Sequence, residues 1–414
     1  VGMNLSRLVT VLGRQAGYDG VLSVGRVQTP TLKLVVDRDR EIARFVSVPY
    51  WAIAVSLFAG GSTFAAQWVP PDACTDDAGR CLRQPVAQQT MQQIRAAGSA
   101  HVVSVETERV REGPPLPFDL GTLQEVCSKQ LGLDVQETLD IAQALYETHK
   151  ATTYPRSDSG YLPESMLAEV PAVLDSLVKT DPGLRPLIDR LDHQQRSRAW
   201  NDGKVTAHHG IIPTLEPANL SVMSEKELAV YRLIRAHYLA QLLPHHEFDR
   251  TVAQFSCGSQ SLVAVGKQIA VIGWREVLAT PGPDDAGGED AQRSQVLPAL
   301  HAGLSCPVGK VDLKALKTLP PKPYTQGELI KAMKTVAKFV TDPRLKQKLK
   351  DTVGIGTEAW QTGLLVSFKA LVPKGERMDP VKNLEQMFSM RNLVEFLKWT
   401  NGVDTENWPP NIEG

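Results

Sequence analysis

The sequence lacks any long uninterrupted run of apolar residues. None of its 414 residues belongs to a stretch approaching the ~20 apolar residues of a membrane-spanning helix. The first residues, Val1 to Asn4, carry neither an initiator methionine nor the apolar segment of a secretory signal peptide. We therefore expect a cytoplasmic protein with no membrane partner, and its beginning is typical of a piece of a longer polypeptide.

Cysteine is scarce, and neither sign of charge dominates. The five cysteines are scattered without a CxxC pair, so the sequence favours neither a disulfide framework nor a zinc site. The 45 Lys and Arg residues nearly balance 46 Asp and Glu residues, for a net charge of −1. This balance excludes a histone-like protein, although a local basic surface suffices to bind nucleic acid. The length indicates roughly two to four domains.

Hydrophobic periodicity divides the chain into alternating helical and β regions. Residues 4–44 are helical in character around a glycine-broken turn at 17–20, and residues 50–57 alternate with a period of two. The order helical, β, helical, β, helical predicts an α+β multidomain fold in which a helical module interrupts a β-rich one. Further predicted features are capping boxes of Asp134 with Glu137, Ser224 with Glu227 and Thr325 with Glu328, strands at 63–69, 101–106, 251–255, 262–265 and 269–274, a surface loop at 280–288 and a helix starting at 342–343.

The helix that follows Asp134 leads towards the first candidate site. It is predicted to bury a stripe containing Leu139, Ala142 and Tyr146 and to end near His149 and Lys150, because cations suit its carbonyl end. Just beyond it lie the residues Thr-Thr-Tyr-Pro-Arg-Ser-Asp-Ser at 152–159.

Tyr154 and Arg156 in this segment could form a nucleophilic pair. A phenol has a pKa of about 10 and needs a nearby cation to attack at neutral pH. Pro155 favours an extended residue before it, and residues two apart share a face of an extended chain, so Arg156 could stabilise the phenolate or bind a phosphate. An ordinary turn with a packed tyrosine and a surface arginine is the alternative.

Three other segments could contact an anionic ligand. Residues 204–214 contain Lys204 and His208, and a histidine can bind phosphate or transfer a proton near neutral pH; no carboxylate or thiolate lies at metal-ligand spacing. Residues 22–30 contain Arg26 and Gln28 beside a glycine, and residues 331–350 are rich in lysine and arginine. Two glycines precede Thr357 and could form a small anion nest. A structural histidine pair, a solvated loop and a solvated basic helix are the alternatives.

In their order along the chain, these motifs resemble the type IA DNA topoisomerases, specifically the topoisomerase III branch. The resemblance covers residues 2–359. It rests on Asn-Leu-Ser-Arg at 4–7, residues 22–30 continuing into Val-Asp-Arg-Asp-Arg-Glu-Ile at 36–42, Pro-Tyr-Trp at 49–51, Ala-Gln-Ala-Leu-Tyr-Glu at 142–147, residues 153–158, 207–214 and 245–250, and Gly-Ile-Gly-Thr-Glu-Ala at 354–359.

The resemblance implies the roles of these residues. Tyr154 would attack a DNA phosphodiester to give a 5′-phosphotyrosine link and a 3′-hydroxyl, with Arg156 stabilising the covalent state and His208 in the active site. The DNA-binding positions would be Arg7, Arg26, Gln28, Lys204 and Thr357. Strands would be cleaved, passed and rejoined without ATP, which relaxes or decatenates DNA. The partner would be mainly single-stranded DNA, and the protein a monomer.

The resemblance also implies a ring-shaped fold and a division into segments. The Mg²⁺ of the family is bound by carboxylates of a Toprim domain that has no counterpart in this sequence, so the isolated chain is expected to be impaired. A single-stranded DNA-binding protein without cleavage chemistry is the alternative function. The expected segments are 1–46 (helical, DNA-binding), 47–113 (first part of a β-rich arch), 114–246 (helical, carrying the catalytic tyrosine), 247–318 (second part of the arch), 319–359 (helical and basic) and 360–414 (a divergent tail).

Overall fold

The structure is a computed structural model that describes residues 2–25, 27–192, 194–278, 295–339 and 343. The chain divides into two compact units: Val1–Leu34 belong to one, and Val35–Gly363 form the other. The predicted loop at 280–288, the helix start at residue 342 and the tail at 360–414 lie outside the described residues.

The first unit consists of a helix and the segment that returns along it. α1 (Gly2–Gln15) ends before a turn at Gly17, whose positive φ of 86° suits glycine. Two hydroxyls of α1 then bind the returning backbone: Thr10 Oγ1 accepts from Leu22 N (2.9 Å), and Ser6 Oγ accepts from Val24 N (2.9 Å). α2 (Gln28–Arg44) starts directly after this segment, so the predicted helical character of residues 4–44 is confirmed.

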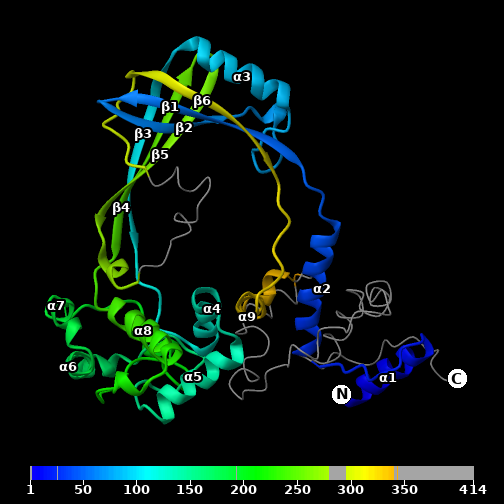
Figure 1. The fold of residues 1–414 in the computed structure, drawn as a ribbon, viewed down its shortest axis with the longest axis vertical. Helices are drawn as coiled ribbons and strands as arrows, with labels where there is room; N and C mark the ends of the chain where they lie inside the picture. The colour runs from blue at the N-terminus through cyan, green and yellow to red at the C-terminus, as the bar shows by residue number, and fades with distance from the viewer. Residues whose placement is uncertain (1, 26, 193, 279–294, 340–342, 344–414) are drawn as a thin grey trace. The chain divides into compact units, whose positions relative to one another are not determined.

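In the second unit, six antiparallel strands close into a barrel (Figure 1) in the order β1, β2, β5, β4, β3, β6. Three strands precede the helical insertion and three follow it, so both parts of the chain build one sheet. Their bounds are β1 (Pro49–Ala59), β2 (Ser62–Val69), β3 (Ser99–Glu112), β4 (His246–Cys257), β5 (Gln260–Val271) and β6 (Ser305–Lys317).

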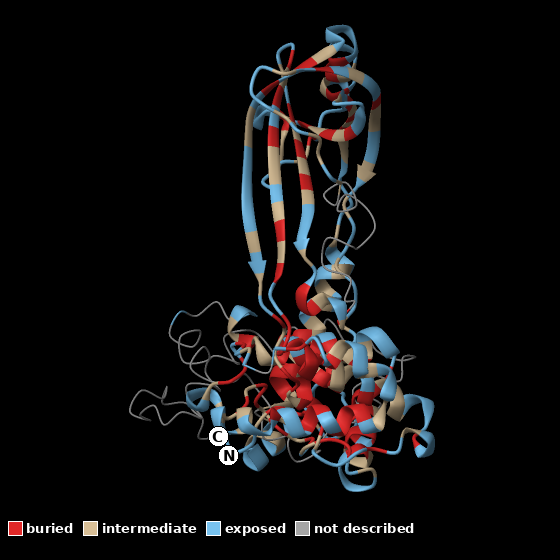
Figure 2. Ribbon diagram, turned by 90° about the vertical axis from the view of Figure 1, so that its left-hand side faces the viewer, coloured by how far each residue is buried: buried red, intermediate tan, exposed pale blue. Residues whose placement is uncertain are grey.

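Alternating residues of these strands fill the barrel. Ile53, Val55 and Leu57 of β1 are almost fully buried, as expected for a strand with one face in a core. α3 (Gln84–Ala97), which the sequence did not predict, adds Ala87 and Ile94 to the same core. Figure 2 shows the resulting alternation of buried and less buried residues along the strands.

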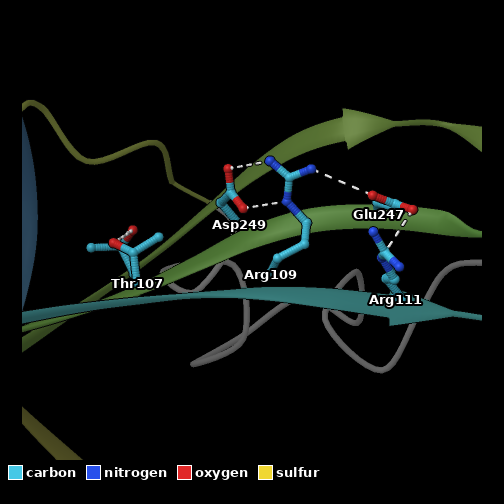
Figure 3. A network of polar contacts seen from close by, with 6 residues as sticks. Thr107, Arg109, Arg111, Glu247 and Asp249 are labelled. Carbon is cyan, nitrogen blue, oxygen red and sulfur yellow. Dashed lines mark hydrogen bonds and ion pairs between the residues drawn. The ribbon is translucent and has the colours of Figure 1, made fainter.

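Beyond its first few residues β3 is half-buried or exposed, and its pairing with β4 is reinforced by charge. Arg109 Nε donates to Asp249 Oδ1 (2.5 Å), and Figure 3 shows Arg111 beside Glu247 on the same two strands. Together with Arg250 and Glu108, whose side chains lie 3.2 Å apart, these residues form the β3–β4 ion-pair ladder.

The helical insertion has its own apolar core, which contains Leu145, Leu174 and Tyr231. It consists of α4 (Leu120–Leu131), α5 (Val135–Glu147), α6 (Val170–Thr180), α7 (Arg185–Ile188) and α8 (Glu225–Ala240). Short 3-10 turns complete the second unit: η1 (Asp72–Cys74), η2 (Glu164–Glu169), η3 (Pro182–Leu184), η4 (Asp202–Lys204), η5 (Leu220–Val222), η6 (Gly273–Glu276) and η9 (Val336–Phe339).

α9 (Gln326–Lys334) packs against α4 of the helical domain. Gly327 permits this approach, because a Cβ there would lie only 3.0 Å from the Cα of Glu125. Lys331 forms an ion pair with Glu125 (2.7 Å), and Lys334 Nζ donates to Asp119 Oδ1 (2.5 Å). Since Asp119 is the N-cap of α4, this lysine binds the carboxylate that starts the helix.

The structure confirms the mixed α+β fold and corrects several details. The capping boxes at Ser224 and Thr325 are present, whereas Asp134 caps α5 alone and Glu137 pairs with Lys226. Residues 262–265 and 269–271 are extended as predicted, but their division into two strands is wrong, because β5 runs without interruption from Gln260 to Val271; residues 273–274 belong to the 3-10 turn η6.

Candidate active site

The loop that carries Tyr154 begins with a sharp reversal at the end of α5. Lys150 has a positive φ of 53°, which is uncommon for a residue with a side chain. The reversal lets Ala151 N donate to Leu145 O (2.8 Å), and Thr214 Oγ1 donates to Lys150 O (2.6 Å). α5 therefore ends at Glu147, earlier than predicted, and the chain turns directly into the candidate site.

Two loops, 151–160 and 206–214, are held together by backbone and side-chain hydrogen bonds. Thr153 N donates to Ile212 O (2.9 Å), and Ile212 N donates to Thr153 Oγ1 (3.0 Å). Phe118 O accepts from Ile211 N (2.8 Å), so the segment before α4 joins the pair. A Cβ on Gly160 would lie 2.6 Å from Pro117 O, which shows how closely these backbones approach one another.

Two histidines of the helical domain make polar contacts near these loops. The His237 ring packs 3.8 Å from the Phe118 ring, and its Nδ1 lies 3.0 Å from Leu116 O. Burial lowers the pKa of His237 to about 4, against a small opposing effect of that carbonyl. Glu227 at the start of α8 lies 3.2 Å from His149; its pKa is lowered, chiefly because its carboxylate accepts the backbone N–H of the N-cap serine.

Tyr154 is presented to solvent between two aromatic rings. Its side chain is 37% exposed, and its ring lies 4.5 Å from that of His208 and 5.8 Å, edge to face, from that of Tyr146. The structure therefore brings Tyr154 and His208 together from positions more than fifty residues apart. Tyr146 does not belong to the predicted buried stripe: it is also 37% exposed, while Leu139 and Ala142 are buried.

Arg156 is held by a glutamine of α5. Its Nη2 donates to Gln143 Oε1 (3.0 Å), and Gln143 Nε2 donates in turn to Glu147 Oε1 (2.6 Å). Pro155 and Arg156 form a turn, so the expectation that Tyr154 and Arg156 share one face of an extended strand is wrong. The guanidinium is oriented by α5 and not by strand alternation.

Lys204 lies at the edge of the same pair of loops. Its Nζ lies 3.4 Å from the Tyr161 hydroxyl and 5.0 Å from the centre of that ring. Nearby, Thr206 Oγ1 donates to Asp158 Oδ1 (2.5 Å), which adds a side-chain bond between the loops. Lys204 therefore remains an exposed cation at the border of the candidate site.

The other predicted DNA-binding residues are divided between the first unit and the undescribed residues. Arg7 is exposed on α1. Gln28 starts α2, and its Oε1 accepts from Ser23 Oγ (3.0 Å). Arg26 and Thr357 lie outside the described residues.

Sequence reasoning missed several contacts of this site. Gln143 belongs to a motif of the family but has no predicted role, Tyr146 is predicted in a buried stripe and not at the site, and the bond between Asp158 and Thr206 is not predicted. The three-residue spacing of Gln143 and Tyr146 places both on the side of α5 that meets the Tyr154 loop, which was the available signal.

Neither a metal centre nor a membrane span is found in the part of the chain that the structure describes. Within it, no three His, Cys, Asp or Glu side chains are grouped closely enough to hold a metal ion. No helix among those residues has the length and apolar character needed to cross a bilayer. His208 and His209 thus lack the additional ligands that a metal centre of described residues would need.

Comparison with known proteins identifies the class. A family model described as DNA topoisomerase matches residues 1–365, and the chain belongs to this family, the type IA DNA topoisomerases. Similar relatives of the topoisomerase III branch are DNA topoisomerase 3 of Salmonella typhimurium, 40% identical over 88% of this chain, and that of Pasteurella multocida, 37% identical over 96%.

The fold is similar to that of a solved relative. Full-length topoisomerase I from Thermotoga maritima matches 98% of this chain and 63% of its own, with a TM-score of 0.63 and 24% sequence identity. The chain spans 56% and 62% of the lengths of the Salmonella and Pasteurella relatives. A second model, described as the FlhB HrpN YscU SpaS family, matches residues 349–402, outside the described part.

Proposed function

We propose that the chain carries the catalytic tyrosine of a topoisomerase III active site. Such an enzyme is an ATP-independent isomerase that cleaves, passes and rejoins single DNA strands. The observation that carries this proposal is the half-exposed Tyr154 ring in contact with His208 on two clamped loops. A nucleophile must be both accessible and fixed in position, and this arrangement provides both conditions.

In the proposed step, Tyr154 Oη forms a bond to the phosphorus of a DNA phosphodiester. The bond from phosphorus to O3′ breaks, the phenol loses its proton, and O3′ leaves as a 3′-hydroxyl after gaining one. Arg156 would stabilise the charged phosphate oxygens, because a guanidinium can bind two of them at once. His208, in contact with the phenol ring, would bind the phosphate or transfer a proton.

We propose that the protein is a monomer and that it binds mainly single-stranded DNA. Lys204 borders the site as an exposed cation, and Arg7 and Gln28 would contact the strand from the first unit. The expected division into segments and the ring-shaped fold are part of this proposal. Since phosphate contacts release counterions, affinity for single-stranded DNA should fall steeply with salt, and a flat salt response would contradict it.

The family typically uses Mg²⁺. The described residues offer no cluster of carboxylates that fits this ion, so no part of the proposed step passes through it. We propose that these 414 residues alone bind single-stranded DNA but relax supercoiled plasmid poorly, and that adding a separately produced Toprim domain, which binds Mg²⁺ in the family, increases relaxation. Robust Mg²⁺-dependent relaxation by the chain alone would contradict this part of the proposal.

The test is to trap the covalent intermediate. The chain is mixed with a single-stranded oligonucleotide labelled at its 3′ end, with and without a Toprim domain and Mg²⁺, and the reaction is stopped with denaturant. Because the tyrosine would retain the 5′-phosphate of the downstream fragment, the 3′ label should migrate with the protein, whereas a 5′ label should be released.

Tyr154→Phe is the critical variant, and Tyr146→Phe is the matched control from the same aromatic group. The proposal predicts that Tyr154→Phe abolishes the adduct and retains DNA binding, whereas Tyr146→Phe still forms it. The alternative, a single-stranded DNA-binding protein without chemistry, predicts no adduct under any of these conditions and equal behaviour of both variants.

A further inference from the structure

We propose that Cys74 and Cys81 form a dithiol site that closes reversibly into an intramolecular disulfide in the barrel. The two residues bracket a short loop between β2 and α3, and their thiols belong to the same core cluster. This site is distinct from the proposed active site and does not depend on it.

The backbone already holds the two cysteines next to each other. Leu82 N donates to Cys74 O (3.0 Å), and Thr75 pairs with Cys81 as an antiparallel bridge. Trp51 N donates to Cys81 O (2.9 Å), so the loop is also fixed to β1. Closing the disulfide therefore requires little rearrangement of the main chain.

Each thiol donates to a nearby backbone carbonyl: Cys74 Sγ to Pro71 O (3.2 Å) and Cys81 Sγ to Arg83 O (3.6 Å). Cys74 is the last residue of the 3-10 turn η1, so the alternation of side chains along a strand does not apply to it. Its pKa is raised, first by burial and then by a hydrogen bond and charge interaction with the Cys81 thiol. Both thiols are free, with exposures of 7% for Cys74 and 0% for Cys81, so Cys74 is the one that a small reagent reaches first.

The remaining cysteines provide internal controls. Cys257 on β4 and Cys306 on β6 are buried in the same barrel, but these strands pair with opposite edges of β3. Two strand spacings separate their backbones by about 10 Å, which is too far for a disulfide. Cys127 lies in the core of the helical domain, where burial raises its pKa to about 12.

The oxidant is a low-molecular-weight disulfide. The Cys74 thiolate attacks one of its sulfurs to form a mixed disulfide and release the first small thiol. The Cys81 thiolate then attacks the Cys74 sulfur and releases the second small thiol. In total, one cystine forms, two protons leave the protein thiols, and one molecule of oxidant is reduced to two thiols.

The experiment incubates the full chain overnight, under native conditions, with either reduced glutathione or a large excess of its disulfide. The protein is then precipitated in acid, dissolved in denaturant at neutral pH and alkylated with N-ethylmaleimide, because the reagent reacts with the thiolate. The proposal predicts five adducts on the reduced protein and three on the oxidised one. Because trypsin cleaves after Arg80, between the two cysteines, the oxidised sample should contain residues 45–80 linked to residues 81–83.

Single substitutions separate this pair from accidental oxidation. Cys74→Ser should keep four alkylatable thiols under both conditions. Cys81→Ser should stop at the mixed disulfide of Cys74 with glutathione and fall from four alkylatable thiols to three, whereas Cys257→Ser should still lose two on oxidation. Incubation of oxidised protein with dithiothreitol should restore all five thiols. Five adducts after oxidation, a link that involves Cys127, Cys257 or Cys306, or glutathione mixed disulfides alone would each overturn the proposal.

Discussion

The barrel and the helical domain use polar side chains for different purposes. In the barrel, exposed arginines pair with carboxylates between β3 and β4, as Arg109 does with Asp249 (Figure 3). In the helical domain, His237 Nδ1 lies 3.0 Å from the backbone oxygen of Leu116, Thr153 Oγ1 accepts from the backbone of Ile212, and the neighbouring Tyr154 stays exposed. Ion pairs therefore do not by themselves indicate chemistry, because the paired arginines of β3 and β4 lie outside the candidate site.

The largest difference is expected between two arginines, one from each region. Arg156→Ala should slow cleavage or rejoining on the order of 10²- to 10³-fold, because one cationic group beside the reacting phosphate is lost. Arg109→Ala, in the barrel ladder, should leave the rates unchanged. Adduct formation and single-stranded DNA affinity are measured together, and an equal loss of binding in Arg156→Ala would refute its assignment as chiefly catalytic.

The second difference concerns pH. His237 has its pKa lowered by burial to about 4, whereas the unfolded chain binds this proton near pH 6.5. Stability should therefore be retained above pH 6.5 and lost as pH falls towards 4, by up to about 3 kcal/mol. His237→Gln should flatten the curve in this window.

Hydrogen exchange measured at pH 7 and pH 5 shows which region of the protein loses stability when His237 becomes protonated. The loss of protection should be concentrated in the helical domain and should spare the barrel strands. A uniform loss over both regions, or an unchanged pH dependence in His237→Gln, would contradict the assignment.

One glycine in each region has an equally close neighbour, so the cost of adding a methyl group can be compared between the helical domain and the barrel. A Cβ on Gly160 would lie 2.6 Å from the backbone oxygen of Pro117, and one on Gly309 of β6 would lie 2.6 Å from the exposed ring of Phe58. Gly160→Ala should destabilise the protein by about 1–3 kcal/mol, because backbone cannot move aside. Gly309→Ala should cost less, because a flexible side chain can move; urea denaturation of both variants decides the comparison.

The smallest effect is expected in the β3–β4 ion-pair ladder. Its members are largely exposed, and exposed pairs contribute little and are screened by salt. Arg109→Ala should lower the melting temperature slightly at low ionic strength and by less in 1 M NaCl, because added salt weakens the attraction between exposed charges. A large decrease in melting temperature that does not depend on salt would mean that interactions other than charge hold β3 and β4 together.

Local patterns predicted most elements of the fold. Ser224 and Thr325 start helices as expected, because capping is decided within four residues. β5 continues through Gly266, which lies between the two strands predicted there. A side chain there would lie 2.6 Å from Leu297, so this glycine provides space for a segment that follows thirty residues later. Such a contact between distant residues is invisible to a local pattern.

The same limit applies to the candidate site. The motif containing Tyr154 and Arg156 is evident in the sequence, and the resemblance alone suggested that His208 lies in the same site; the structure places the two rings 4.5 Å apart. The partner of Arg156 was not foreseen, because Gln143 approaches only after the chain reverses at Lys150. A residue with a side chain rarely adopts that conformation, so propensity argued against the turn.

The most direct test of the account is to identify the residue that carries DNA. Trapped adduct is digested with nuclease and trypsin, and the peptide with remaining nucleotides is sequenced by mass spectrometry. The account predicts a nucleotide on Tyr154 in the peptide of residues 151–156, bounded by Lys150 and Arg156. A nucleotide on Tyr146, Tyr161 or a serine, with Tyr154 unmodified, would contradict it.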